Sequence, residues 1–85
     1  MNFKELPSNP LYDGIQYKAK FSNGYGASIV KHKFSYGGRI GLYELAVTKG
    51  DGLCYDTPIT NDVLGHLTEE EVNEILTKIE QLDKE

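Results

Sequence analysis

The sequence contains one cysteine, two histidines and no long hydrophobic run, and these shortages exclude several classes of protein. Because Cys54 stands alone, the chain cannot close a disulfide on itself, and it lacks the four Cys or His ligands of a structural zinc site. No apolar stretch is long enough for a signal peptide or a membrane span. We therefore expect a cytoplasmic protein that binds no metal or other cofactor and does not enter a membrane.

The chain is short, at 85 residues, and has room for one hydrophobic core. We divide it into an extended N-terminal arm over residues 1–14, where Pro7 and Pro10 interrupt any periodic pattern, and a single domain over residues 15–85. A core of this size leaves only a few kcal/mol of stability. A homodimer is therefore one expectation.

Charge is distributed unequally along the chain. Residues 1–50 hold seven of the nine Lys and Arg residues, whereas residues 51–85 hold ten of the thirteen Asp and Glu residues. Asymmetry of this kind is typical of surfaces used for association, and it does not indicate a reaction.

The dipeptide Asn23-Gly24 lies between two alternating segments and predicts a β-hairpin. A two-residue turn is favoured because both residues tolerate a positive φ. This turn would pair Tyr17 with Val30, so that Val30 points into the core and Ile29 points outward. The outward face would then carry a ladder of four lysines: Lys18, Lys20, Lys31 and Lys33.

Two more strands are expected after the hairpin, over residues 42–48 and 53–57. A three-residue loop between them would place Leu53 beside Val47, on the core side of the sheet. The apolar spacing over residues 59–67 favours a short helical turn.

The C-terminal segment has the pattern of an amphipathic helix. Thr68 and Glu71 form a capping box, and an apolar stripe follows at helical spacing: Val72, Ile75, Leu76, Ile79 and Leu82. The predicted fold class is therefore α+β, a four-stranded antiparallel β-meander with a short helical turn and a C-terminal α-helix packed on one face.

No residues are grouped as catalysis would require. A nucleophilic mechanism needs a cysteine or serine close to a histidine, with a third group that orients the imidazole. His32 falls near the end of a predicted strand and His66 beside the start of the helix, and no local pattern joins either to a nucleophile. We therefore predict that the protein is not an enzyme.

Two surfaces are candidates for binding a protein partner. The first is a glycine-rich loop, which presents these side chains: Tyr36, Arg39 and Ile40. Tyrosine and arginine dominate protein interfaces, and no core role explains them here. The second is an acidic edge, which contains these carboxylates: Asp62, Glu70 and Glu74. Such an edge either stabilises the helix start or attracts a basic partner.

The lysine ladder is the alternative surface, because lysines on neighbouring strands suit a nucleic-acid backbone. The isoelectric point near 5.1 opposes non-specific attraction to phosphates. We therefore predict a protein partner first and nucleic-acid binding second.

Four segments carry a resemblance to a known group of proteins: NGYGAS at residues 23–28, GLYELAV at 41–47, LCYDTPIT at 53–60 and LGHLT at 64–68. The chain resembles, from about residue 11 to 82, a family of small uncharacterised proteins encoded by bacteriophages and prophages. No activity or functional residue follows from this resemblance. It implies by analogy a protein that binds and inhibits a host protein, such as a nucleic-acid-handling complex or a defence complex of the kind that anti-CRISPR proteins target.

Overall fold

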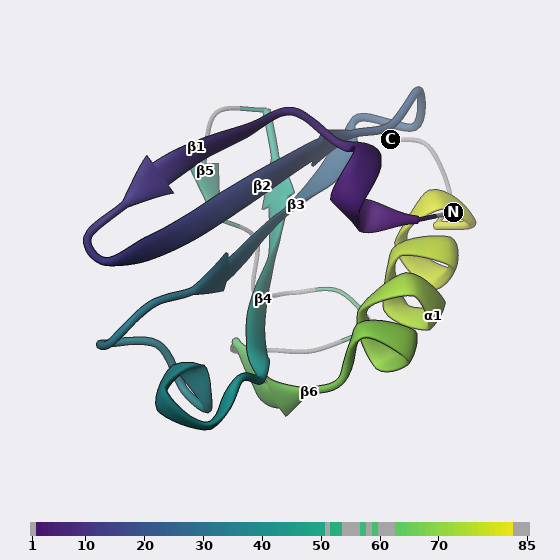
Figure 1. Cartoon of the computed structure of the whole chain (residues 1–85). Helices are drawn as coiled ribbons and strands as arrows, with labels where there is room; N and C mark the ends of the chain where they lie inside the picture. The colour runs from purple at the N-terminus through teal and green to yellow at the C-terminus, as the bar shows by residue number, and fades with distance from the viewer. Residues whose placement is uncertain (1, 51, 54–56, 58, 60–62, 83–85) are drawn as a thin grey trace.

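The computed structural model describes residues 2–50, 52–53, 57, 59 and 63–82, in which one helix lies against an antiparallel sheet (Figure 1). The elements follow the chain in this order: 3-10 turn η1 (Phe3–Glu5), β1 (Ser8–Leu11), β2 (Gly14–Lys20), β3 (Tyr25–Lys31), 3-10 turn η2 (Gly38–Ile40), β4 (Tyr43–Lys49), β5 (Gly52–Leu53), β6 (Leu64–Leu67) and α1 (Glu69–Glu80). The predicted α+β class is confirmed. The described residues form six strands, however, rather than four.

The strands are neighbours in the order β1-β2-β3-β4-β5, and β6 also pairs with β4. Because β3 occupies one edge of β4, β5 and β6 share the other edge at its two ends. The helix packs against β3, β4 and β6. The β1–β2 turn and the loop between β3 and β4 lie away from α1, at the opposite side of the molecule (Figure 1).

The hairpin of β2 and β3 has a longer turn than the sequence predicted. Phe21 donates its N–H to the Tyr25 carbonyl at 2.8 Å, which leaves a three-residue loop with Gly24 at φ 90°. Tyr17 therefore pairs with Ile29, one residue away from the predicted partner. Ile29 is fully buried on the helix side of the sheet, so its predicted outward position is wrong.

The cause of this register is a tertiary contact of Asn23. Its Oδ1 accepts from the Tyr25 N–H at 3.0 Å. Its Nδ2 donates to two carbonyls at the end of α1, those of Ile79 and Glu80, at 2.9 and 3.2 Å, and to the Leu82 carbonyl just beyond the helix at 3.0 Å. The last carbonyls of a helix have no partner within the helix. Asn23 therefore caps the helix, which favours the three-residue loop over the two-residue turn.

Residues 64–67 form a strand, and the helical turn predicted there is wrong. Tyr43 pairs with Leu67 and Leu45 with Leu64, so two residues of β6 oppose one of β4 in a bulge. The bulge brings Leu64 and Leu67 onto the core together. Apolar residues three apart normally indicate a helix. The same spacing here results from the extra residue of the bulge.

The predicted third strand is confirmed, and the fourth is corrected in the part that the structure describes. Tyr43, Leu45 and Val47 alternate inward on β4 and are buried. Leu53 pairs with Thr48, so it belongs to the face opposite the helix and is 55% exposed. The predicted inward position of Leu53 is therefore wrong. Residues 54–56 of that predicted strand lie outside the described residues.

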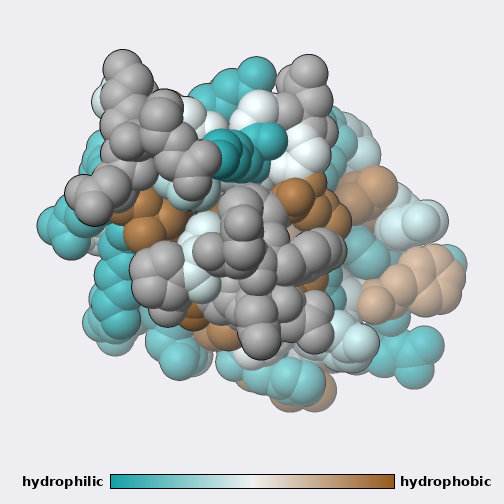
Figure 2. Space-filling model, turned by 180° about the vertical axis from the view of Figure 1, so that it is seen from behind, coloured by the Kyte–Doolittle hydropathy of each residue, from teal (hydrophilic) through white to brown (hydrophobic). Residues whose placement is uncertain are grey.

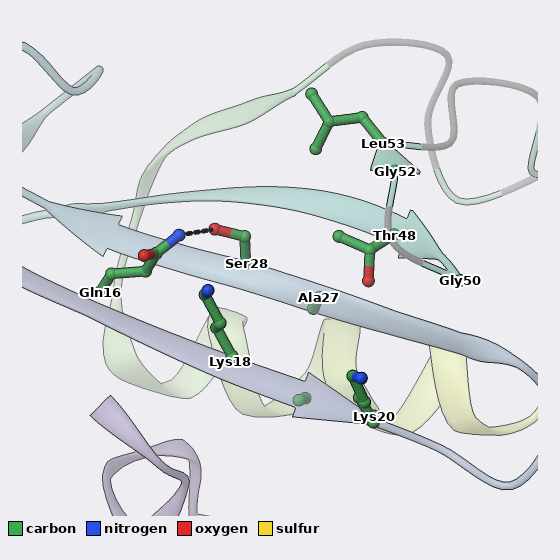
Figure 3. A pocket seen from close by; sticks show the side chains of 10 residues that line it. Gln16, Lys18, Lys20, Ala27, Ser28, Thr48, Gly50, Gly52 and Leu53 are labelled. Carbon is green, nitrogen blue, oxygen red and sulfur yellow. Dashed lines mark hydrogen bonds between the residues drawn. The ribbon is translucent and has the colours of Figure 1, made fainter. Parts of the chain in front are cut away.

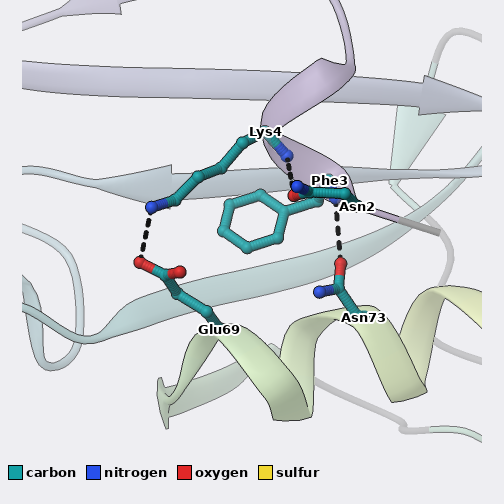
Figure 4. A network of polar contacts seen from close by, with 5 residues as sticks. All are labelled: Asn2, Phe3, Lys4, Glu69 and Asn73. Atoms are coloured by element: carbon teal, nitrogen blue, oxygen red, sulfur yellow. Dashed lines mark hydrogen bonds and ion pairs between the residues drawn. The ribbon is translucent and has the colours of Figure 1, made fainter.

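Residues 2–14, which the sequence suggested as an arm, contribute a ring to the core. The Phe3 side chain is fully buried between the sheet and α1 (Figure 4). The Phe3 ring is in edge contact with the rings of Tyr17 and Tyr43, at centroid distances of 5.1 and 4.9 Å. The Phe3 backbone N–H donates to the Asn73 side chain of α1 at 2.9 Å. β1 then forms the sheet edge, where its proline can be tolerated.

The C-terminal helix agrees with its prediction. Thr68 is the N-cap, and the reciprocal hydrogen bonds of the capping box with Glu71 are both present. Val72, Leu76 and Ile79 are fully buried against the sheet. This helix and the Phe3 ring cover the core on one face of the sheet. The large apolar side chains that stay exposed therefore need a separate explanation.

Candidate partner-binding surface

Most of the large apolar side chains that the structure exposes lie at one end of the sheet. Tyr12 belongs to the β1–β2 turn, while Phe34, Tyr36 and Ile40 belong to the loop between β3 and β4; their exposed fractions are 67%, 65%, 61% and 71%. In Figure 2, viewed from behind, this end is at the right, where hydrophobic side chains protrude among hydrophilic ones. We name the surface the aromatic end, formed by Tyr12, His32, Phe34, Tyr36 and Ile40.

Three rings of the aromatic end contact one another. The Tyr12 ring meets His32 at a centroid distance of 4.9 Å and Phe34 at 5.0 Å, both edge to face, and His32 and Phe34 are 6.2 Å apart. The Phe34 N–H donates to His32 Nδ1 at 3.1 Å. This hydrogen bond holds the two rings in a fixed relation, and it requires an unprotonated Nδ1.

Hydrogen bonds also fix the loop that carries these rings. The Ser35 hydroxyl accepts from the His32 N–H at 3.0 Å and donates to the His32 carbonyl at 2.9 Å. The Glu44 carboxylate accepts from the Tyr36 N–H at 3.0 Å. On its other side the Tyr36 side chain lies on β6, where a Cβ added to Gly65 would come within 2.5 Å of the Tyr36 Cβ. The exposed side chains are thus displayed from an ordered backbone.

Two residues at this end have a strained backbone. Tyr12 and His66, each with φ 55°, are the non-glycine residues with positive φ in the part of the chain that the structure describes. A non-glycine residue in such a conformation costs about 1 to 3 kcal/mol, and such residues cluster at binding and catalytic sites. His66 is the neighbour of Gly65 and donates its N–H to the Tyr36 carbonyl at 3.1 Å. Strain and exposed rings therefore coincide.

The structure brings the predicted loop residues into this surface. Tyr36 and Ile40 are exposed in the aromatic end, and Arg39 is exposed beside Ile40. Sequence reasoning did not select Tyr12 or Phe34, and it considered His32 only for catalysis. A signal was present for Phe34, an aromatic residue between a predicted strand and a glycine-rich loop, where no apolar period assigns it to the core.

The acidic edge is only partly described. Glu70 and Glu74 are exposed on α1, and Asp62 lies outside the described residues. Their neighbours have structural roles, because Glu71 completes the capping box and Glu69 forms an ion pair with Lys4 at 2.7 Å. Part of the negative charge at the helix start is thereby accounted for.

The predicted lysine ladder does not form, because the register differs by one residue. Lys18 and Lys20 lie on the face opposite the helix, where they line a shallow groove of about 420 Å³ with Ser28 and Thr48 (Figure 3). Lys31 is on the helix side, with its Nζ 4.9 Å from the centre of the Tyr43 ring. Lys33 lies beyond the strand, with its Nζ 5.2 Å from the centre of the Phe34 ring.

Within the described residues, no three His, Cys, Asp or Glu side chains are grouped as a metal ion would require. None of the described helices is both long enough and apolar enough to cross a bilayer.

Comparisons with protein-family models, with curated proteins and with solved structures found no match for this chain. The assignment of a function therefore depends on the exposed rings, the strained backbone and the charges described above.

Proposed function

We propose that this chain is a non-catalytic protein-binding module and that the aromatic end is its contact surface. The observation that carries the proposal is the gathering of four large exposed apolar side chains at one end, on a backbone held by hydrogen bonds. Soluble monomers rarely leave such side chains together in water unless they form an interaction site. Fixed aromatic residues are also the usual anchors of protein interfaces, because little entropy is lost when they bind.

The resemblance to small bacteriophage proteins supports a more specific proposal about the partner. The chain would act in the cytoplasm of a bacterial host, where it binds a host protein and inhibits it. A nucleic-acid-handling or defence complex, such as a target of the anti-CRISPR type, fits this analogy. The acidic edge, with Glu70 and Glu74, is the second surface that such a partner could touch.

Nucleic-acid binding is the second candidate function, and the groove that Lys18 and Lys20 line is the observation in its favour. Two lysines on one face would release few counterions, so we expect weak binding with a shallow dependence on salt. Lys18→Glu with Lys20→Glu should remove it.

The test of the main proposal is capture of a partner from a bacterial lysate that has been treated with nuclease. Tyr12→Ala with Phe34→Ala should abolish capture while leaving the protein folded. Leu53→Ala is the matched control, because Leu53 is also exposed but lies away from the aromatic end. Capture that survives the double substitution, or that is lost equally in the control, would contradict the proposal.

A further inference from the structure

A small, open cavity beside the exposed rings has two cationic residues, Lys33 and Arg39, in its lining. It has a volume of about 210 Å³, and these residues line it: Lys33, Ser35, Gly37, Arg39, Ile40 and His66. No acidic side chain is among the lining residues that the structure describes. A lysine and an arginine around one small space attract a carboxylate or a phosphate, and the guanidinium can bind either with two parallel hydrogen bonds.

Two carboxylates of the described residues accept hydrogen bonds from the backbone of this loop. Asp13 Oδ1 accepts from the Lys33 N–H at 2.9 Å, and Glu44 Oε1 accepts from the Tyr36 N–H at 3.0 Å. Within the described part of the chain, neither Lys33 nor Arg39 forms an ion pair. The Lys33 ammonium group does contact the Phe34 ring, with its Nζ 5.2 Å from the ring centre, but no carboxylate of the described residues neutralises either cation.

We propose that this cavity receives an aspartate or glutamate side chain of the partner protein, beside an apolar side chain that packs on the rings of the aromatic end. The inference rests on the protein-binding function proposed above and adds the chemistry of the partner. It predicts a partner surface in which a carboxylate adjoins an apolar residue. Complementary charge of this kind selects the partner and fixes its register more than it adds affinity.

The rings favour a protein over a single-stranded nucleic acid. A base stacks on the open face of an aromatic ring. One face of Phe34 is covered by the Lys33 ammonium group, and Tyr12 meets Phe34 edge to face with 87° between the ring planes. The net charge of −4 further opposes a polyanion. An apolar side chain, which has no stacking requirement, fits this surface better.

The experiment is selection of peptides from a random displayed library, with the whole protein as bait. Wild type should enrich peptides in which Asp or Glu adjoins an apolar residue. Lys33→Glu with Arg39→Glu should weaken the best synthetic peptide by about tenfold or more and should enrich Lys or Arg in place of the acid. Lys18→Glu with Lys20→Glu, which makes the same charge change on the opposite face, should leave the peptide affinity unchanged.

Each contrary outcome identifies what has failed. If the wild type enriches apolar peptides without acidic residues, and Tyr12→Ala with Phe34→Ala abolishes their binding, the inference about charge is overturned and the proposed function is kept. Enrichment that is identical in wild type and this double variant would overturn both. Salt-sensitive binding of a single-stranded oligonucleotide, abolished by Lys33→Glu with Arg39→Glu, would assign the cavity to phosphate. If the protein self-associates, and both Lys33→Glu with Arg39→Glu and Glu70→Lys with Glu74→Lys abolish this self-association, the occupant of the cavity is a second copy of the chain. That result would overturn the inference.

Discussion

Replacing Asn23 by aspartate tests whether the hairpin turn caps the helix. The two side chains have nearly the same shape, and both can accept from the Tyr25 N–H as Oδ1 now does. Only the Nδ2 donor is exchanged for a carboxylate oxygen. That oxygen would face the carbonyls of Ile79, Glu80 and Leu82, to which Nδ2 now donates. Asn23→Asp should therefore destabilise the fold although the turn conformation is retained.

The magnitude follows from the donors lost and the charge gained. A hydrogen bond contributes about 0.5 to 1.5 kcal/mol net, and water can reach part of this site, so loss of the amide in Asn23→Ala should cost about 1 to 2 kcal/mol. A negative charge at a helix C-terminus costs about 0.3 to 1 kcal/mol more, because it opposes the helix macrodipole. We therefore expect Asn23→Asp to cost about 1.3 to 3 kcal/mol, which is more than Asn23→Ala costs.

The assay is urea unfolding of wild type, both variants and Ser22→Asp, an exposed position in the same loop that controls for net charge. The new carboxylate would have its pKa raised by the facing carbonyls, so its penalty is present above the ordinary aspartate pKa of about 4 and diminishes as the pH falls toward it. Asn23→Asp should thus approach Asn23→Ala in acid. If Asn23→Asp is no less stable than Ser22→Asp at neutral pH, the helix cap has been misread.

Three further results are expected. Phe3→Ala should lower the free energy of unfolding by about 3 kcal/mol or more because it empties a fully buried site, and an effect as small as that of a surface substitution would contradict the burial of this ring. His66→Gly should raise the melting midpoint by relieving the positive φ and His66→Val should lower it, so equal midpoints would argue against strain. The hydrogen bond to Glu69 raises the pKa of Lys4, so the ion pair stabilises the fold at pH values below the ordinary lysine pKa. This stabilisation is lost as the pH rises through the raised pKa of Lys4. Lys4→Met should remove this pH dependence and should change the overall stability little, because the pair is exposed.

The sequence predicted the elements whose causes are local and missed those that depend on distant residues. The helix was assigned correctly because its cap and its apolar stripe lie within one segment. The hairpin was shifted by one residue because Asn23 serves a helix that begins more than forty residues later. β6 was mistaken for a helix because a bulge gives two inward leucines the spacing of a helical turn. In each error the local pattern was real, and a tertiary contact changed its meaning.

The same distinction applies to the candidate surface. Tyr36, Arg39 and Ile40 could be selected because a glycine-rich segment offers no core in which to place them. Tyr12 joins this surface through its ring contacts with His32 and Phe34, which follow a different strand, and no periodicity in the sequence encodes those contacts. The lysine surface failed for the opposite reason. Its four members were assembled by a register, and one residue of error moved Lys31 to the other face.

The two residues with a strained backbone, Tyr12 and His66, lie at the same end of the sheet as the exposed rings. A domain of this size has a margin of only a few kcal/mol, so two non-glycine residues at positive φ are a substantial cost to it. Glycine at Tyr12 would relieve that strain but would remove the ring that joins His32 to Phe34. At His66 the same change would remove a side chain that lines the cationic cavity. Each of the two strained positions thus contributes a residue to the aromatic end or to the cavity beside it. This is expected where a protein gives up stability for a binding geometry.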